Sequence, residues 1–212
     1  MKNLSQSFRS LFFSTKCSVC GKDIETTTQY ICHECFKVLR RKSEIKNIDN
    51  YYFLYYYDDD IKKIITDYKL KNRKGLSKEI SILIKKPLKE LIREKRINIV
   101  IPVPISRNRM KERGFNQVEE ILKELRIDYK TIDRVKDTEH MYSILEEKKR
   151  EENIKKAFRN NWVNANEKNI LIIDDIVTTG STIKEVVNEI RKKNSPKEIY
   201  IFSIAMSKFF KK

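Results

Sequence analysis

The sequence has 212 residues, of which 40% are hydrophobic and 10% are aromatic. This length and composition fit one folded domain with a small appendage, and they argue against a disordered chain or two full domains. Lys and Arg number 46 against 30 Asp and Glu, which gives a net charge of +16. The excess favours polyanionic partners such as nucleic acids or phosphorylated substrates, but it equally fits a lysine-rich surface that binds neither.

The N-terminal residues do not resemble a secretion signal. Their longest apolar run, Leu11-Phe12-Phe13, is shorter than the roughly 7 to 15 apolar residues of a secretory core. Leu4, Phe8, Leu11 and Phe12 have helical spacing instead, which predicts a short amphipathic helix that packs on the rest of the protein. No apolar stretch approaches the roughly 18 to 20 residues of a membrane span. We therefore expect a cytoplasmic protein without a membrane span.

All four cysteines lie near the N-terminus, in two Cys-x-x-Cys pairs: Cys17, Cys20, Cys32 and Cys35. Four thiolates with this spacing can surround zinc tetrahedrally, and Gly21 suits the tight turn after the first pair. Two disulfides or redox pairs are the alternative, but a cytoplasmic chain keeps its thiols reduced. We predict a closed, structural Zn²⁺ site with His33 outside it, in a module spanning residues 1–45 ahead of a larger domain of residues 46–212.

Strand and helix patterns alternate through the larger domain. Apolar or aromatic runs predict strands at residues 51–57, 97–101, 170–173 and 199–205. Helical spacing predicts a helix after the aspartates at 58–60, one at 77–95 that bends or restarts at Pro87, one at 115–125 and one at 181–193. Residues 37–50 are expected to form a basic connector. The alternation favours an α/β fold with a parallel sheet.

The segment from Ile170 to Thr182 carries the strongest functional signal. Four apolar residues are followed by Asp174 and Asp175, and then by a glycine- and hydroxyl-rich turn that leads into a helix. The turn contains Thr178, Thr179, Gly180, Ser181 and Thr182. Such a turn can bind phosphate, because backbone amides and hydroxyls donate to it and glycine allows a close approach.

Paired carboxylates beside a phosphate site need a reason, because like charges repel. A ribose supplies one, since its vicinal hydroxyls can donate to Asp174 and Asp175, and Mg²⁺ nearby would offset the remaining charge. The pattern therefore predicts a phosphorylated sugar rather than a bare phosphate. A capped helix start without any ligand is the alternative, and it accounts for one or two of these residues.

This segment closely resembles the phosphoribosyl-pyrophosphate binding motif of type I phosphoribosyltransferases. Together with the cysteines, two further segments extend the resemblance to the ComF family of competence-associated proteins over nearly the whole chain: Pro102-Val103-Pro104 followed by Arg113-Gly114-Phe115-Asn116-Gln117, and Arg150-x-x-Asn153-x4-Phe158. Relatives usually carry a Gln and a Leu before the last segment. Here Leu145 is present but the Gln position falls on Tyr142, so we take no site residue from 138–145.

The resemblance implies a Rossmann-like parallel sheet of the type I phosphoribosyltransferase kind. It implies that Asp174 and Asp175 contact the ribose hydroxyls of phosphoribosyl pyrophosphate, that residues 178–182 hold its 5′-phosphate, and that the pyrophosphate lies near residues 102–109. It also implies a role in DNA uptake during natural transformation, with other competence proteins as possible partners. Basic and polar side chains suited to pyrophosphate or a nucleic-acid backbone, or simply solvated, are Arg107, Arg109, Lys111, Arg113 and Asn116.

Three functions remain open at the level of sequence. The first is transfer of the phosphoribosyl group to a nitrogen nucleophile, although no acceptor site is identified unless the cysteine module and residues 51–57 form it. The second is non-catalytic binding of single-stranded DNA, with residues 69–74 and 107–113 as backbone contacts. The third is a regulatory protein that senses phosphoribosyl pyrophosphate without turning it over.

Overall fold

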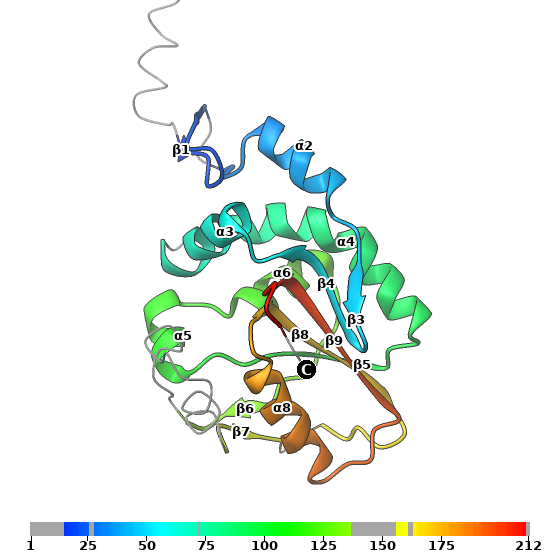
Figure 1. The fold of residues 1–212 in the computed structure, drawn as a ribbon. Coiled ribbons are helices and arrows are strands. Elements are labelled where there is room, and N and C mark those ends of the chain that lie inside the picture. Colours follow the sequence, from blue (N-terminus) through cyan, green and yellow to red (C-terminus); the bar gives the residue numbers. More distant parts are fainter. Residues whose placement is uncertain (1–14, 26–27, 72, 137–155, 161–162, 211–212) are drawn as a thin grey trace, which may run out of the picture.

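The computed structural model describes residues 15–25, 28–71, 73–136, 156–160 and 163–210. Its centre is a five-stranded sheet in the order β3-β4-β9-β8-β5, formed by Lys46–Ile48, Tyr51–Tyr56, Glu198–Met206, Asn169–Val177 and Ile99–Pro102. The edge strand β3 is antiparallel to β4, whereas β4, β9, β8 and β5 run parallel (Figure 1). The predicted α/β fold with a mostly parallel sheet is confirmed.

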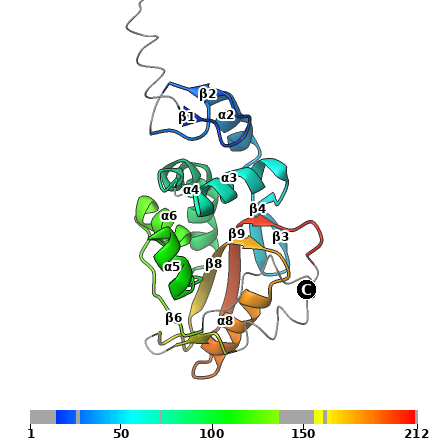
Figure 2. The same ribbon diagram turned by 90° about the vertical axis from the view of Figure 1, so that its left-hand side faces the viewer.

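Helices cover both faces of this sheet (Figures 1 and 2). One face packs against α3 (Asp59–Leu70), α4 (Leu76–Glu94) and α6 (Gln117–Leu125). The other packs against α8 (Ser181–Arg191) and a small sheet of β6 (Asp133–Arg134) and β7 (Phe158–Arg159). Because side chains alternate along a strand, Leu171 and Ile173 of β8 join the first core and Ile170 and Ile172 join the second.

Several elements differ from the sequence-based prediction. The helix α4 continues through Pro87, although proline removes one backbone donor from it. Pro102 ends β5 instead of following it, which is tolerated because β5 is an edge strand. The expected connector contains the end of α2 (His33–Arg41) and all of β3, and a short helix, α5 (Arg107–Arg113), was not predicted.

The cysteine module, formed by β1 (Thr15–Lys16), β2 (Asp23–Ile24) and α2, lies against α3 and α4 (Figure 1). The buried carboxylate of Glu79 on α4 accepts hydrogen bonds from the backbone N–H groups of Tyr30 and Ile31, each at 2.9 Å. Ile31 also belongs to the apolar core on the α4 side of the sheet. The module therefore shares its core with the larger domain, and a boundary near residue 45 stays a prediction.

Arg73, which follows α3, fastens the module from a second side. Its Nη1 atom donates to the backbone oxygen of Lys16 and to Oγ of Ser18, both at 3.0 Å. The same atom pairs with Asp67 of α3 at 3.0 Å. Arg73 consequently joins the last turns of α3 to the first Cys-x-x-Cys pair.

In the part of the chain that the structure describes, no helix combines the length and the apolar character needed to cross a membrane. The predicted N-terminal amphipathic helix and residues 138–145 lie outside the described residues.

Candidate functional site

A cavity of about 280 Å³ opens beyond the carboxyl-terminal ends of β8 and β5. Open α/β sheets bind their ligands at this edge. Among the described residues, the polar lining includes carboxylates, threonine hydroxyls and cations, together with Gln117 and Tyr57: Asp174 and Asp175, Thr178 and Thr182, and Lys69, Arg109 and Arg134. The cavity therefore offers partners for both hydroxyl and phosphate groups.

The turn between β8 and α8 depends on Gly180. Its φ of +76° lies in the left-handed region, where other residues are strained. The hydroxyls of Thr179 and Ser181 lie 2.9 Å apart within this turn, while Thr178 and Thr182 line the cavity. Because α8 begins at Ser181, its first backbone N–H groups have no partner inside the helix. Together with the helix dipole, these amides favour an anion at the turn.

We expect Gly180→Ala to weaken the binding of phosphate ligands about tenfold. An alanine there is strained by about 1 to 2 kcal/mol, and its Cβ would lie 3.0 Å from Cε2 of Phe210. Without ligand, the turn of the variant can relax out of the strained conformation, and ligand binding would have to restore that conformation. Gly21→Ala is the matched control, because Gly21 has φ +75° but no atom within 4 Å of an added Cβ. Calorimetric titration of both variants checks the expectation, and equal affinities would contradict it.

The two aspartates have different surroundings although they are adjacent. Asp175 is buried, and its Oδ2 atom accepts from Nζ of Lys69 and from Nε2 of Gln117, each at 2.7 Å. Burial alone would raise the pKa of Asp175, but these two partners hold it below its usual value. Asp174 is partly exposed, and burial together with the charge of Asp175 raises its pKa to about 7. The strand β8 ends at Val177, later than predicted, so both carboxylates belong to the strand and line the cavity. Asp175 is in addition bonded to side chains of α3 and α6.

The predicted basic and polar residues separate into three groups. Arg109 lines the cavity, whereas Arg107 and Lys111 are exposed on α5. Arg113 donates to Oε1 of Gln117 at 3.2 Å and lines a neighbouring hollow. Asn116 is buried as the N-cap of α6, and its amide also donates to the backbone oxygen of Val103 at 3.2 Å. The structure therefore gives Asn116 a place in the fold, holding the loop that follows β5.

The basic stretch at residues 69–74 was one of the predicted DNA-binding segments. Its described cations are ion-paired: Lys69 with Asp175 at 2.7 Å, Lys71 with Asp67 at 2.8 Å, Arg73 with Asp67 at 3.0 Å, and Lys74 with Glu120 at 2.8 Å. These pairs reduce the charge that the segment presents to a polyanion.

Sequence reasoning missed several cavity residues. Arg134 comes from β6, and no motif marked it as a site residue. Lys69 comes from α3 and was predicted only as a contact to a nucleic-acid backbone, not as a partner of Asp175. Gln117 stood within a recognised segment but was not chosen. Tyr57, from the aromatic strand considered as part of an acceptor site, lines the cavity, whereas the described residues of the cysteine module do not.

The cysteine module brings its four sulfur atoms within 4.8 Å of one another. A tetrahedral zinc ion with Zn–S bonds of about 2.3 Å needs sulfurs about 3.8 Å apart, and Sγ of Cys20 lies 3.8 Å from Sγ of Cys32. Burial raises the pKa of Cys17, but backbone amides, including that of Cys32 at 3.3 Å, lower it further, to about 7. The donor set and its spacing fit Zn²⁺, and Gly21 adopts the expected turn with φ +75°.

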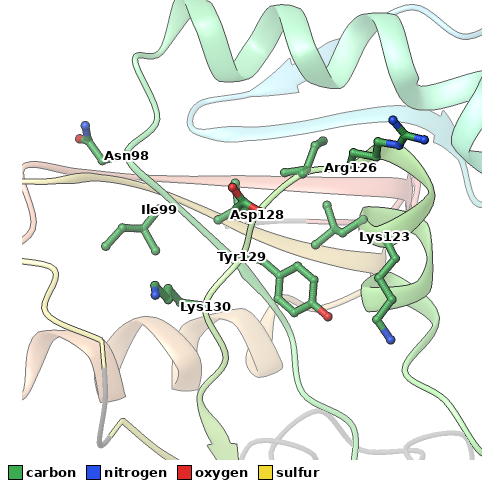
Figure 3. Close-up of a pocket in the computed structure, with 10 residues that line it drawn as sticks. Asn98, Ile99, Lys123, Arg126, Asp128, Tyr129 and Lys130 are labelled. Carbon is green, nitrogen blue, oxygen red and sulfur yellow. The ribbon is translucent and has the colours of Figure 1, made fainter.

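A larger cavity of about 720 Å³ lies elsewhere, between the start of β5 and the segment after α6 (Figure 3). Its lining includes Lys123, Arg126, Asp128 and Lys130, and it contains none of the predicted site residues. It begins at Asn98 and Ile99, the opposite end of β5 from the loop at Val103. We therefore place the candidate site at the smaller cavity.

Comparisons with known proteins agree with the predicted resemblance. No family model matches the chain. The chain is similar to Competence protein F of Haemophilus influenzae, with 26% identity over 200 residues, covering 89% of this chain and 83% of that protein. This relative supports the resemblance to the ComF family.

Solved structures similar to the chain include two phosphoribosyltransferases. A purine phosphoribosyltransferase from Pyrococcus horikoshii Ot3 is 22% identical, with 60% of this chain and 73% of that chain covered and a TM-score of 0.37. A hypoxanthine phosphoribosyltransferase from Staphylococcus aureus is 15% identical, with 59% and 62% covered and a TM-score of 0.39. The assignment of the candidate site rests on the strand order and on the position of the cavity, both described above.

Proposed function

We propose that this chain is a phosphoribosyltransferase-like competence protein that binds phosphoribosyl pyrophosphate in the 280 Å³ cavity. One observation carries the proposal: the cavity combines carboxylates, threonine hydroxyls and cations at the carboxyl-terminal edge of a parallel sheet. A sugar that carries both hydroxyls and phosphates matches this combination. A bare phosphate would leave the carboxylates without a favourable partner.

In this proposal the 5′-phosphate lies in the turn at residues 178–182. Thr178 and Thr182 line the cavity, and the N-terminus of α8 supplies partial positive charge. The ribose hydroxyls lie at the pair Asp174 and Asp175. Ser181 and Thr179 bond to each other and keep the turn in shape.

The pyrophosphate lies near the loop after β5, where Arg109 and Arg134 line the cavity. Arg134 also donates to the backbone oxygen of Pro104 at 3.4 Å, so it supports that loop. We assign Mg²⁺ to the pyrophosphate oxygens, because magnesium in nucleotide-type sites is held largely by phosphates and water. Bound there, it would supply charge neutralisation of the leaving group.

Transfer of the phosphoribosyl group is a separate step beyond binding. The pyrophosphate would leave C1 of the ribose while a nitrogen nucleophile bonds to it, and positive charge would develop on the ring. Such a reaction depends on positioning and electrostatics more than on a strong base. The cavity supplies groups for the donor, whereas no described residue identifies the acceptor.

Single-stranded DNA is the alternative ligand. The exposed Arg107 and Lys111 on α5 adjoin the cavity residue Arg109, so a nucleic-acid backbone could follow this helix to the phosphate turn. In either case we propose that the four cysteines bind a structural Zn²⁺, which suits a reducing, cytoplasmic location.

Calorimetric titration with phosphoribosyl pyrophosphate and Mg²⁺ tests the proposal. We expect binding by the natural chain and its loss in the double variant Asp174→Ala/Asp175→Ala. The double variant Glu124→Ala/Asp128→Ala removes the same charge from exposed positions and should bind normally. A natural chain that does not bind, or a first variant that binds unchanged, would refute the site. Adding an oligothymidine in a further titration separates the ligands, since competition is expected only if DNA occupies the same cavity.

A further inference from the structure

Lys69 is the cavity residue with the most constrained surroundings. Its side chain, 11% exposed, ends on Oδ2 of Asp175 at 2.7 Å, and the carboxylate is 5% exposed. Gln117 donates to the same oxygen at 2.7 Å. A buried carboxylate bonded in this way is held in one orientation, because losing either partner would leave a charge or a polar group unsatisfied.

The partners of Asp175 are themselves fixed by neighbouring helices. Oε1 of Gln117 accepts from Arg113 of α5 at 3.2 Å. The backbone oxygen of Gln117 accepts from the hydroxyl of Tyr68 at 2.9 Å. Tyr68 precedes Lys69 on α3 and is almost fully buried. The network therefore joins α3, α5 and α6 to β8 at a single carboxylate.

Asp174 has a different set of contacts. Its Oδ1 atom accepts the backbone N–H of Asp175 at 2.8 Å, whereas Lys69 and Gln117 bond to Asp175. Asp174 is also partly exposed, whereas Asp175 is buried. Of the two carboxylates at the cavity, Asp174 is therefore the more accessible to a ligand.

We propose, on the basis of the proposed function, that Lys69 is a positioning residue that fixes the carboxylate of Asp175 in one orientation. Asp174 alone then accepts the ribose hydroxyls. Asp175 then contributes shape and charge balance, since Lys69 neutralises it beside a highly anionic ligand. The structure thus divides the paired aspartates into one ligand-binding residue and one residue held by the fold.

The test compares two probes, ribose 5-phosphate and 2-deoxyribose 5-phosphate, which differ by one hydroxyl. For the natural chain we expect the ribose form to bind about tenfold tighter, as a hydrogen bond to a charged group predicts. Asp174→Ala should bring the two affinities close together. Lys69→Met should weaken both probes and lower the melting temperature, because it leaves the buried carboxylate without its cation.

The double variant Lys69→Met/Asp175→Asn decides the proposal. It removes both charges while Gln117 can still donate to the amide oxygen, so we expect it to melt higher than Lys69→Met and to regain the tenfold preference for ribose. A folded double variant without that preference would show that Asp175 binds a hydroxyl, and the proposal would be wrong. A natural chain that binds neither probe, or both equally, would instead refute the proposed function.

Discussion

Removal of the proposed zinc ion should unfold the cysteine module and lower the free energy of unfolding of the chain by several kcal/mol. Structural zinc binding contributes about 10 to 16 kcal/mol to the folding of small zinc-dependent domains. In this chain, packing also stabilises the cysteine module, because Cys17, Ile31 and Leu39 belong to the apolar core on one face of the sheet. We therefore expect a smaller loss than in an isolated zinc domain. Thermal unfolding with and without a strong chelator measures it.

The metal content gives an independent check. Elemental analysis should find one zinc ion per chain, and Cys20→Ser, at the exposed member of the cluster, should reduce it. His33→Ala is the matched control, because His33 is exposed on α2 and lies outside the set of four sulfurs. A chain that melts at the same temperature with and without chelator would contradict a structural zinc site.

Affinity for phosphoribosyl pyrophosphate should fall about tenfold per pH unit as the pH drops below about 7. The reason is Asp174, whose pKa is raised to about 7 by burial and by the charge of Asp175. Below that pH the carboxyl is protonated and accepts ribose hydroxyls less well. The ionised fraction, and with it the affinity, then falls about tenfold for each pH unit. Titrations at a series of pH values, repeated with Asp174→Asn, separate this effect from titration of the ligand phosphates.

The pH series also has a consequence for stability, with opposite signs for the two aspartates. The pKa of Asp174 lies above its ordinary value of 3.8, so this group destabilises the fold at neutral pH and does so less as the pH falls through 7. The pKa of Asp175 is lowered, so its contribution is present above its ordinary pKa and is lost in acid. The charges of Lys69 and Arg113 act on the pair, and Arg109 and Arg134 line the same cavity. Affinity that stays constant from about pH 8 to pH 6 would contradict the assignment to Asp174.

Local patterns in the sequence predicted the main elements of the fold. Apolar runs marked β8 and β9, and helical spacing marked α6 and α8, because these elements bury one side or both. The cysteine spacing predicted the cluster for a similar reason, since a tight turn at Gly21 and the first turn of α2 bring the thiolates together. Asp58 caps α3 as expected, with its side chain accepting from the N–H of Ile61 at 3.1 Å.

The partners within the cavity depend on tertiary contacts that no local pattern contains. Lys69 is 106 positions before Asp175 in the chain, and the sequence showed it only as part of a basic segment suited to a nucleic-acid backbone. Arg134 comes from a strand of two residues, too short to show periodicity. The buried role of Asn116 followed from its contact with Val103, which depends on how the loop after β5 folds back.

The last turn of α3 contributes contacts both to the cysteine module and to the cavity. Asp67 pairs with Arg73, which holds the cysteine module, and Lys69 pairs with Asp175 at the cavity. A helix turns by about 100° per residue, so inserting or deleting one residue within α3 would rotate both side chains away from their partners together. We expect that a one-residue insertion or deletion between the helix start and Lys69 is not tolerated.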